Sequence, residues 1–246
     1  MEGMTEYIDT DNFAGVRKCA HIIAQGGLIA FPTETIYGLG ADALKSEAGR
    51  KIFAVKGRPA DNPLIIHITD SSQLDQVEFS TQTAKKLIDA FWPGPLTVVL
   101  KRKSTVPDIT SAGLDAVAVR MPDHDITRRL IKESGKLIAA PSANLSGKPS
   151  PTTAKDVAED MDGKIDAIID GGECKVGIES TVIDLTSEVP MILRPGSITR
   201  EQIVQVIGEV NLHTSNKDNN IRSPGMKYKH YAPKAKVVVI EYDVFD

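Results

Sequence analysis

The stretch LTVVLKRKSTVPDITSAGLDAVAVRM, residues 96–121, decides the fold class of this chain. Its two ends, 96–101 and 115–121, are rich in Val, Leu and Ala and are typical of buried strands. No helix is expected between them, and the expected strands 180–185 and 191–194 also follow one another directly. Since strands elsewhere alternate with helices, the pattern favours an α/β (α+β) fold with a mixed sheet over a purely doubly wound one.

Outward from this stretch, hydrophobic periodicity and turn residues predict the remaining elements. Further strands are expected at 28–34, 63–68, 136–140 and 166–170. Helices are expected at 10–25, 47–58, 81–92, 125–134, 153–160 and 199–208. The second of these helices ends at Gly57, and the third ends before Pro93.

Composition limits the classes of protein to consider. The 246 residues are 41% hydrophobic and 25% charged, which is enough for one sizeable core and is not typical of disorder. The net charge of −4 argues against a protein whose main role is non-specific nucleic-acid binding. No signal peptide or membrane span is predicted, and Cys19 and Cys174 lack metal or CxxC spacing, so we expect a cytoplasmic protein with ordinary thiols.

Several common catalytic motifs are absent from the sequence. There is no P-loop, no GxGxxG after a strand, no HExxH and no GxSxG, and the five His show no paired-ligand spacing, so no protein-bound metal site is expected. Residues 1–208 are interpreted as a catalytic domain and 209–236 as a polar linker. Residues 237–246 are interpreted as the first strand of a C-terminal domain that is otherwise absent.

Five polar loops lie beside the expected strands and carry the candidate chemistry. In KGRPADNPLIIH, residues 56–67, Lys56 and Arg58 suit triphosphate oxygens, although two cations at a helix C-terminus are also favourable for purely structural reasons. In APSANLSGKPSPT, residues 140–152, small hydroxyl and amide groups between a strand and a helix are typical of a phosphate-binding loop.

The other three loops add different groups. FPTETIYGLGADA, residues 31–43, offers hydroxyls, the Glu34 carboxylate and glycines, or alternatively an ordinary turn with a capping Thr. Arg120, in VRMP, is either an ion-pair partner or a clamp for a ligand carboxylate. GIESTVIDL and ILRPG supply Ser180, Thr181 and Arg194. Each loop alone is ambiguous, but together they predict one pocket for a polyanion and a small polar molecule.

Taken in order, FPTETIYGLG, KGRPADNPL, WPGPLTVVL, VAVRMPDH, APSANLSGKPSPT, GIESTVIDL and ILRPG resemble the YrdC-type threonylcarbamoyl-AMP synthases over residues 15–208. SPGMKYKHYAPKA, residues 223–235, resembles the linker of the family's long form. The resemblance implies a twisted mixed sheet flanked by helices, related to dihydroxybutanone-phosphate synthase. It also implies a nucleotidyltransferase that makes threonylcarbamoyl-AMP, pyrophosphate and water from L-threonine, bicarbonate (or CO2) and ATP. A partner transferase then passes the threonylcarbamoyl group to tRNA.

The same resemblance assigns roles to residues. Lys56 and Arg58 are the expected catalytic cations, with Mg2+ accompanying ATP. The expected ATP-binding residues are Arg58, Asn62, Ser142, Asn144, Arg194 and Tyr231, the last reached by the linker folding over the active site. The expected threonine-binding residues are Thr35, His67, Arg120 and Thr181. No general base is assigned, and His67 is the strongest candidate for one.

Three alternative functions stay open at this point. A YrdC-like module that binds nucleotides or double-stranded RNA without synthase activity is the main one. A carbamoyl-transferring relative would carry acylphosphatase and zinc-finger regions, which this sequence lacks. A scaffold with a vestigial pocket is disfavoured because Lys56, Arg58, Ser142 and Asn144 occur together.

Overall fold

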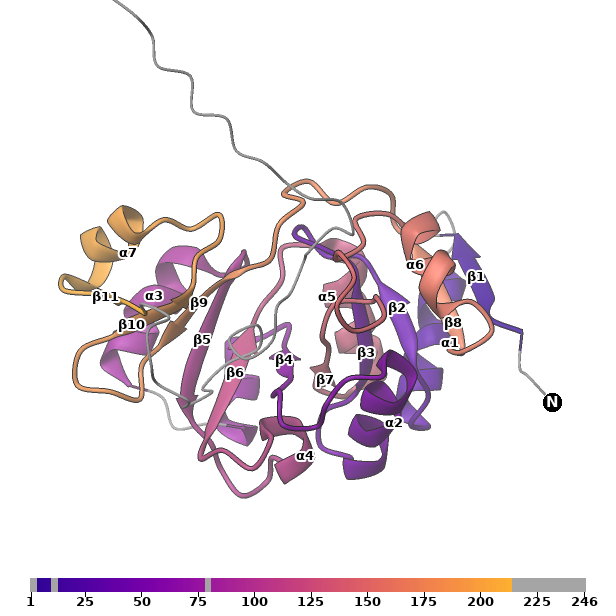
Figure 1. Cartoon of the computed structure of the whole chain (residues 1–246), viewed down its shortest axis with the longest axis horizontal. Coiled ribbons are helices and arrows are strands. Elements are labelled where there is room, and N and C mark those ends of the chain that lie inside the picture. Colours follow the sequence, from indigo (N-terminus) through magenta and orange to yellow (C-terminus); the bar gives the residue numbers. More distant parts are fainter. Residues whose placement is uncertain (1–3, 10–12, 78–80, 214–246) are drawn as a thin grey trace, which may run out of the picture.

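A computed structural model describes residues 4–9, 13–77 and 81–213. The described residues form an 11-stranded sheet whose strands follow one another along the long axis of the molecule in the order β1-β8-β2-β3-β7-β4-β6-β5-β9-β10-β11 (Figure 1). The strands are β1 (Glu6–Asp9), β2 (Ile29–Phe31), β3 (Gly38–Asp42), β4 (Ile65–His67), β5 (Leu96–Lys101), β6 (Ala116–Arg120), β7 (Ile138–Ala139), β8 (Ala167–Asp170), β9 (Thr181–Asp184), β10 (Met191–Arg194) and β11 (Asn211–Leu212).

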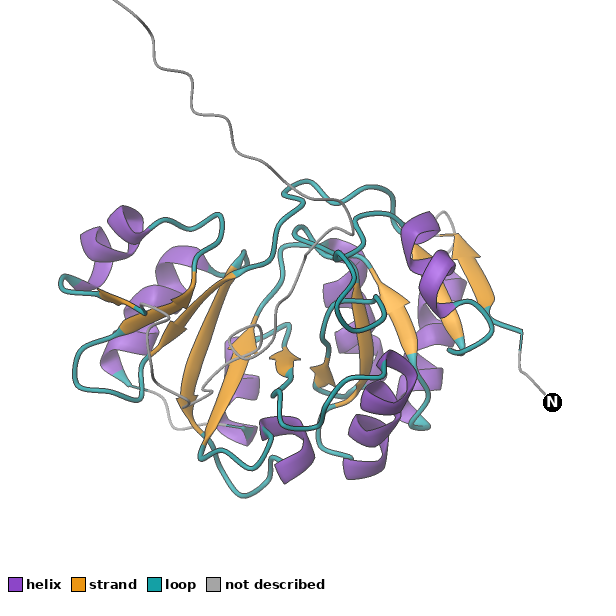
Figure 2. Cartoon of the chain, viewed as in Figure 1, coloured by secondary structure: helices purple, strands orange, loops and turns teal. Residues whose placement is uncertain are grey.

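Helices flank this sheet (Figure 2). They are α1 (Phe13–Ala24), α2 (Ser46–Lys56), α3 (Gln82–Phe91), α4 (Asp108–Ser111), α5 (Asp125–Ser134), α6 (Ala154–Met161) and α7 (Arg200–Ile207), with a 3-10 helix η1 (Ser71–Gln76). The sheet contains both parallel pairs, such as β4 with β6, and antiparallel pairs, such as β5 with β6. The predicted mixed sheet flanked by helices is therefore confirmed.

The main hydrophobic core lies on one face of the sheet. There it joins strand residues such as Ile66, Val98 and Val119 to residues of α2, α3, α6 and α7, for example Ile52 and Leu87. On the opposite face α1 and α5 pack over β2, β7 and β8. The remaining part of that face, over β4, β5, β6, β9 and β10, carries a small cluster of strand residues only: Ile65, Val99, Ala118, Val182 and Leu193, with Ala116 and Met191 at its margin.

The structure also contains short elements that the sequence did not predict. Strand β3, GLGAD, lies within the stretch interpreted as a loop and pairs with β2 and β7. Strand β11 lies within the stretch interpreted as linker and pairs with β10, so the sheet continues a few residues beyond 208. The expected strand at 237–246 and most of the expected linker lie outside the described residues.

Candidate active site

A pocket opens on the part of the sheet that carries the small strand cluster. Because side chains alternate along a strand, Ile65 and His67 of β4 share this face, while Ile66 enters the main core. Likewise Ala118 and Arg120 of β6 face the pocket side, while Val119 faces the main core. The alternation places two of the predicted substrate-binding side chains side by side on adjacent parallel strands.

The pocket collects residues from all five predicted loops. The space between its walls, including the part open to solvent, is about 580 Å³. Its lining consists of Thr33, Ile36, Gly38, Arg58, Ile65, His67, Arg120, Ala140, Pro141, Ser142, Glu179, Ser180 and Arg194. Five of the predicted site residues thus meet here: Arg58, Ser142 and Arg194 from the nucleotide set, and His67 and Arg120 from the threonine set.

Lys56, predicted to contact phosphate, does not line the pocket. Its side chain is only 2% exposed, and its Nζ donates hydrogen bonds to the carbonyls of Ser142 and Asn144. The backbone N–H of Ser146 donates in return to the carbonyl of Lys56 (2.9 Å). Lys56 therefore ties the 140–148 loop to the end of α2, next to the left-handed Gly57 that ends that helix.

Burial, and to a smaller extent the neighbouring Arg58 charge, lower the pKa of the Lys56 ammonium to about 7, against the opposing effect of Asp160. Lys56 is thus a cation whose charge is sensitive to small changes near neutral pH. Because its hydrogen bonds reach the loop that carries Ser142, that loop is coupled to the charge of Lys56.

An ion pair and two further sets of hydrogen bonds also hold this loop. Asp160 of α6 accepts a hydrogen bond from the backbone N–H of Leu145 (2.9 Å) and pairs with Lys148 Nζ. The Asn144 amide donates to the carbonyls of Leu145 and Lys148, at 2.8 Å each. The loop is therefore preorganised with Ser142 directed at the pocket.

The other nucleotide-set residues differ in accessibility. Arg58 lines the pocket and donates to the carbonyls of Asn62 and Pro63 (3.2 and 3.1 Å). Asn62 is 1% exposed, and neither polar atom of its amide has a hydrogen-bond partner among the described residues. Arg194 lines the pocket and donates to the Ser180 carbonyl and to its hydroxyl (3.0 Å).

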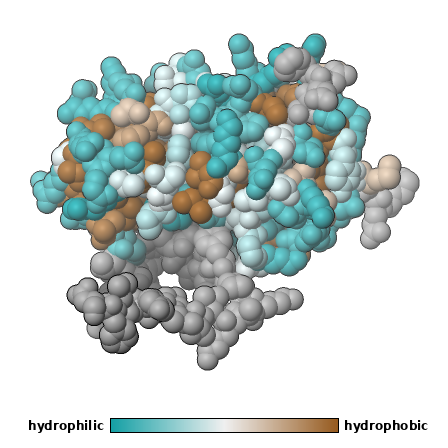
Figure 3. Space-filling model, turned by 90° about the horizontal axis from the view of Figure 1, so that it is seen from above, coloured by the Kyte–Doolittle hydropathy of each residue, from teal (hydrophilic) through white to brown (hydrophobic). Residues whose placement is uncertain are grey.

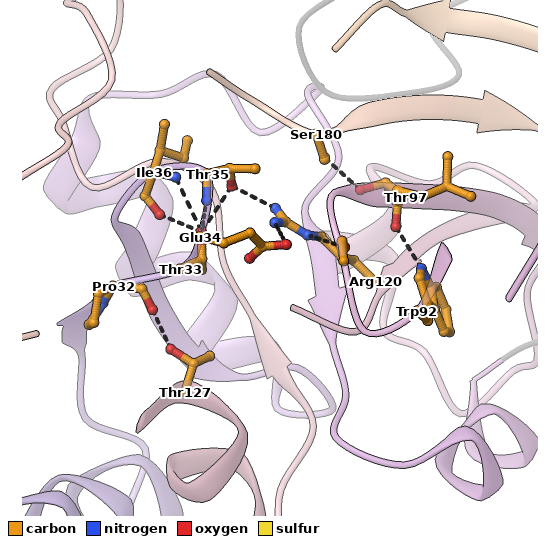
Figure 4. A network of polar contacts seen from close by, with 12 residues as sticks. Pro32, Thr33, Glu34, Thr35, Ile36, Trp92, Thr97, Arg120, Thr127 and Ser180 are labelled. Carbon is orange, nitrogen blue, oxygen red and sulfur yellow. Dashed lines mark hydrogen bonds and ion pairs between the residues drawn. The ribbon is translucent and has the colours of Figure 1, made fainter. Parts of the chain in front are cut away.

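Arg120 lies at the centre of the polar network drawn in Figure 4. Its guanidinium donates to Thr35 Oγ1 (2.9 Å) and to the Gly94 carbonyl (3.3 Å), and its Nη2 lies 2.7 Å from Glu34 Oε1 in a buried ion pair. Thr35 Oγ1 also shares a hydrogen bond with Thr33 Oγ1 (2.9 Å). These contacts hold the planar guanidinium in one orientation at the pocket.

His67 is a neutral, buried imidazole. Burial, followed by the Arg120 charge, lowers its pKa to about 3. Its Nδ1 lies 3.2 Å from the Ile65 carbonyl, and its ring meets Phe31 edge-on at 6.1 Å between centroids. A group with so low a pKa is a weak proton acceptor at neutral pH, so His67 suits hydrogen bonding to a ligand better than general-base catalysis.

Besides Lys56, four predicted residues of the described part of the chain do not line the pocket: Thr35, Asn62, Asn144 and Thr181. The Thr181 hydroxyl donates to the Ile198 carbonyl (2.7 Å), because Thr181 and Ile183 share the face of β9 opposite Val182. The close approach of Gly196, where a Cβ would lie 2.5 Å from Thr181 N, keeps this corner tightly packed. Tyr231 lies outside the described residues.

Two acids at or near the site have no role predicted from the sequence. Glu179 lines the pocket and accepts a hydrogen bond from Ser150 Oγ, whereas Glu34 is buried outside the lining and pairs with Arg120. The only sequence feature that could have indicated Glu34 is its position beside Thr35. Its partner Arg120 is 86 residues away in the sequence and is brought near by strand pairing.

The described residues contain no group of three or more His, Cys, Asp or Glu side chains that could hold a metal ion. No helix among them is long and apolar enough to cross a membrane. On the face drawn in Figure 3, hydrophilic residues predominate and hydrophobic ones form separate small patches. The exposed large hydrophobic side chains of the described residues are Met4, Tyr7, Val176, Ile178 and Leu212.

Two family models match this chain. The Sua5/YciO/YrdC model, described as "Telomere recombination", matches residues 21–196, and a model described as "Threonylcarbamoyl-AMP synthase, C-terminal domain" matches residues 198–244. The chain therefore belongs to the Sua5/YciO/YrdC family, and the resemblance seen in its motifs is confirmed.

Its curated relatives define the branch of that family more narrowly. The threonylcarbamoyl-AMP synthase of Pyrococcus abyssi is 54% identical over 92% of this chain and 68% of the relative's own length. The threonylcarbamoyl-AMP synthase of Bacillus subtilis is 49% identical over 97% of this chain and 70% of the relative. The crystal structure of P. abyssi Sua5 complexed with L-threonine superposes with a TM-score of 0.91, at 52% identity, over 95% of this chain and 70% of that one. The chain is a member of the threonylcarbamoyl-AMP synthase branch, and the binding-module alternative is not favoured.

Proposed function

We propose that this chain forms threonylcarbamoyl-AMP and pyrophosphate from L-threonine, bicarbonate (or CO2) and ATP, with the release of water. The observation that carries the proposal is the pocket itself, where Arg58, Ser142 and Arg194 meet Arg120 and His67 on one exposed part of the sheet. One end of the pocket is thereby suited to phosphate, and the other to a small amino acid.

The chemistry asks mainly for positioning and charge neutralisation. The carbamate formed on the threonine amine attacks the α-phosphorus of ATP, and both reactants are anionic. Arg58 and Arg194 bind phosphate oxygens in this proposal, and Ser142 and Asn144 contact the nucleotide from their preorganised loop. Mg2+ enters as the ATP complex. Lys56 contributes by holding the loop through two carbonyls.

The amino-acid end is assigned to three residues. Arg120 binds the threonine carboxylate in a charge-assisted hydrogen bond, supported by Thr35. The His67 imidazole, neutral at pH 7, forms a hydrogen bond to the substrate.

At the other end, Asn62 completes the nucleotide site, since its buried amide has both polar atoms unpartnered among the described residues.

The role of the C-terminal segment rests on resemblance. We assign residues 209–236 to a linker that covers the site, with Tyr231 contacting the nucleotide, and residues 237–246 to the start of a C-terminal domain. The product passes to a transferase that modifies tRNA. We expect these steps in the cytoplasm.

The test is to incubate the protein with ATP, Mg2+, bicarbonate and L-threonine and to measure pyrophosphate release. Release that requires both threonine and bicarbonate supports the synthase. Folded protein that binds ATP but releases no pyrophosphate in response to threonine would contradict it and favour a nucleotide- or RNA-binding module.

A further inference from the structure

Glu179 is the one acidic side chain among the described residues that lines the pocket. It is partly buried, and its Oε1 accepts a hydrogen bond from Ser150 Oγ. Three arginines, Arg58, Arg120 and Arg194, line the same pocket. No Lys or Arg of the described residues forms an ion pair with Glu179, however. The pocket wall therefore carries a negative charge that no described cation pairs directly.

Two parts of the proposed nucleotide site hold Glu179 in place. Ser150, its hydrogen-bond partner, belongs to the same loop as Ser142. On the other side, the next residue in the chain, Ser180, accepts hydrogen bonds from Arg194 at its carbonyl and its hydroxyl. Both connections place the carboxylate beside the groups that are assigned to the nucleotide.

The charge of Glu179 restricts what can bind next to it. A carboxylate at a triphosphate site repels the nucleotide unless a cation lies between the two anions. Mg2+ takes oxygen ligands, and in nucleotide sites it is typically held by one or two carboxylates together with substrate phosphates and water. The described residues offer no group of three or more metal-binding side chains. One carboxylate beside a phosphate site therefore fits a Mg2+ ion that arrives with ATP, rather than one held by the protein alone.

We propose that Glu179 contacts the Mg2+ ion of MgATP through Oε2, while Ser150 orients the carboxylate through Oε1. This inference rests on the proposed function and adds to it a residue that couples nucleotide binding to the metal. Glu179 opposes the metal-free nucleotide and attracts the magnesium complex, so it makes the pocket selective for MgATP over ATP alone.

Two alternative roles for Glu179 predict different results. In the first, it only links two loops through Ser150. In the second, it binds the ammonium group of threonine, because the segment before it also reaches the amino-acid end, where Gly177 N donates to the Thr35 carbonyl (3.1 Å). The position of Glu179 beside Ser180 and Arg194 favours the metal.

The experiment measures the ATP affinity of the full chain by isothermal titration, once with excess Mg2+ and once with EDTA. Threonine and bicarbonate are left out, so that no reaction occurs. The unaltered protein should bind ATP more tightly with Mg2+. In Glu179→Gln the ratio of the two affinities should fall by about tenfold or more, because a contact to a charged group is lost. Affinity in EDTA should stay the same or increase, since a repelling charge is removed.

Two further variants test the specificity of this effect. Glu173→Gln changes an exposed acid of the same segment that does not line the pocket, and it should leave the ratio unchanged. Ser150→Ala removes the link between the loops but keeps the carboxylate, so the ratio should fall less than in Glu179→Gln. Equal falls in Ser150→Ala and Glu179→Gln would overturn the proposal in favour of a purely structural link.

Other outcomes also decide the question. A ratio unchanged in Glu179→Gln, together with weaker threonine binding, would overturn the proposal in favour of the ammonium group. Thermal unfolding reports whether each variant is folded. If Glu179→Gln does not fold, Glu179→Asp keeps the charge but withdraws it by one methylene and should still lower the ratio; no change there would count against the metal contact. ATP binding by the unaltered protein that does not depend on Mg2+ overturns this inference alone, whereas no ATP binding at all contradicts the proposed function.

Discussion

The guanidinium of Arg120 combines a charge with a fixed plane, and Arg120→Lys tests the second property separately from the first. Lysine keeps the charge but loses the fork that reaches Thr35 and Glu34 together. We expect the KM for threonine to rise about 10- to 100-fold, the range for a lost charge-assisted hydrogen bond, while the KM for ATP changes little. Steady-state pyrophosphate release checks this. Arg102→Lys is the control, because Arg102 is held by the Leu114 and Val106 carbonyls away from the pocket.

His67 makes stability depend on pH in a defined direction. Its pKa falls from 6.5 to about 3 in the folded protein, so between these values only the unfolded chain binds the proton. Stability therefore increases with pH across this window and is lost on acidification, by about 1.4 kcal/mol per pH unit from this one group. Urea unfolding from pH 4 to 7 measures the free energy of unfolding. In His67→Gln this free energy should rise less steeply with pH, and the difference in slope should be the contribution given above. His21→Gln, at an exposed position on α1, should keep the dependence of the unaltered protein; an equal reduction there would contradict the assignment.

At the scale of elements, α6 supports the nucleotide loop through one side chain. Asp160 accepts from the Leu145 N–H and pairs with Lys148, so Asp160→Asn should loosen the loop that carries Ser142 and Asn144. We expect the KM for ATP to rise about 2- to 10-fold, the range for one lost hydrogen bond, with little change in the KM for threonine. Glu159→Gln, on the same helix but outside this network, is the control. Equal changes in both KM values would indicate a general loss of structure instead.

Elements were predictable from sequence where local signals decide them. Helix α5 has the predicted bounds, because its apolar residues recur at helical spacing and Gly135 ends it. Strand β3 was missed, because GLGAD has no β-branched residue and is held by pairing with β2 and β7. Thr181 was predicted in the correct strand, but the direction of its hydroxyl was not predictable. That direction depends on the register of β9 with β5 and β10, which is also set by strand pairing.

At the scale of the whole molecule, the site depends on pairings between distant segments. Arg120 lies on β6, and Glu34 lies in the loop after β2. Three strands, β3, β7 and β4, lie between β2 and β6 in the sheet. The motifs predicted which loops meet, since all five contribute to the pocket. They did not predict that Lys56 is buried behind the loop. That outcome depends on how α2 packs against the sheet, which no local pattern specifies.

The three hydrophobic clusters of the described residues use only residues 8–210, so deleting residues 222–246 should leave a folded protein with a cooperative thermal transition. If the deleted segment covers the site, as proposed, water then reaches the mixed anhydride of threonylcarbamoyl-AMP, and the product should decay faster on the enzyme. Chromatography of quenched single-turnover reactions measures that decay, with Tyr231→Ala as the point variant. A folded deletion protein whose product survives as long as that of the full chain would show that residues 222–246 do not protect it.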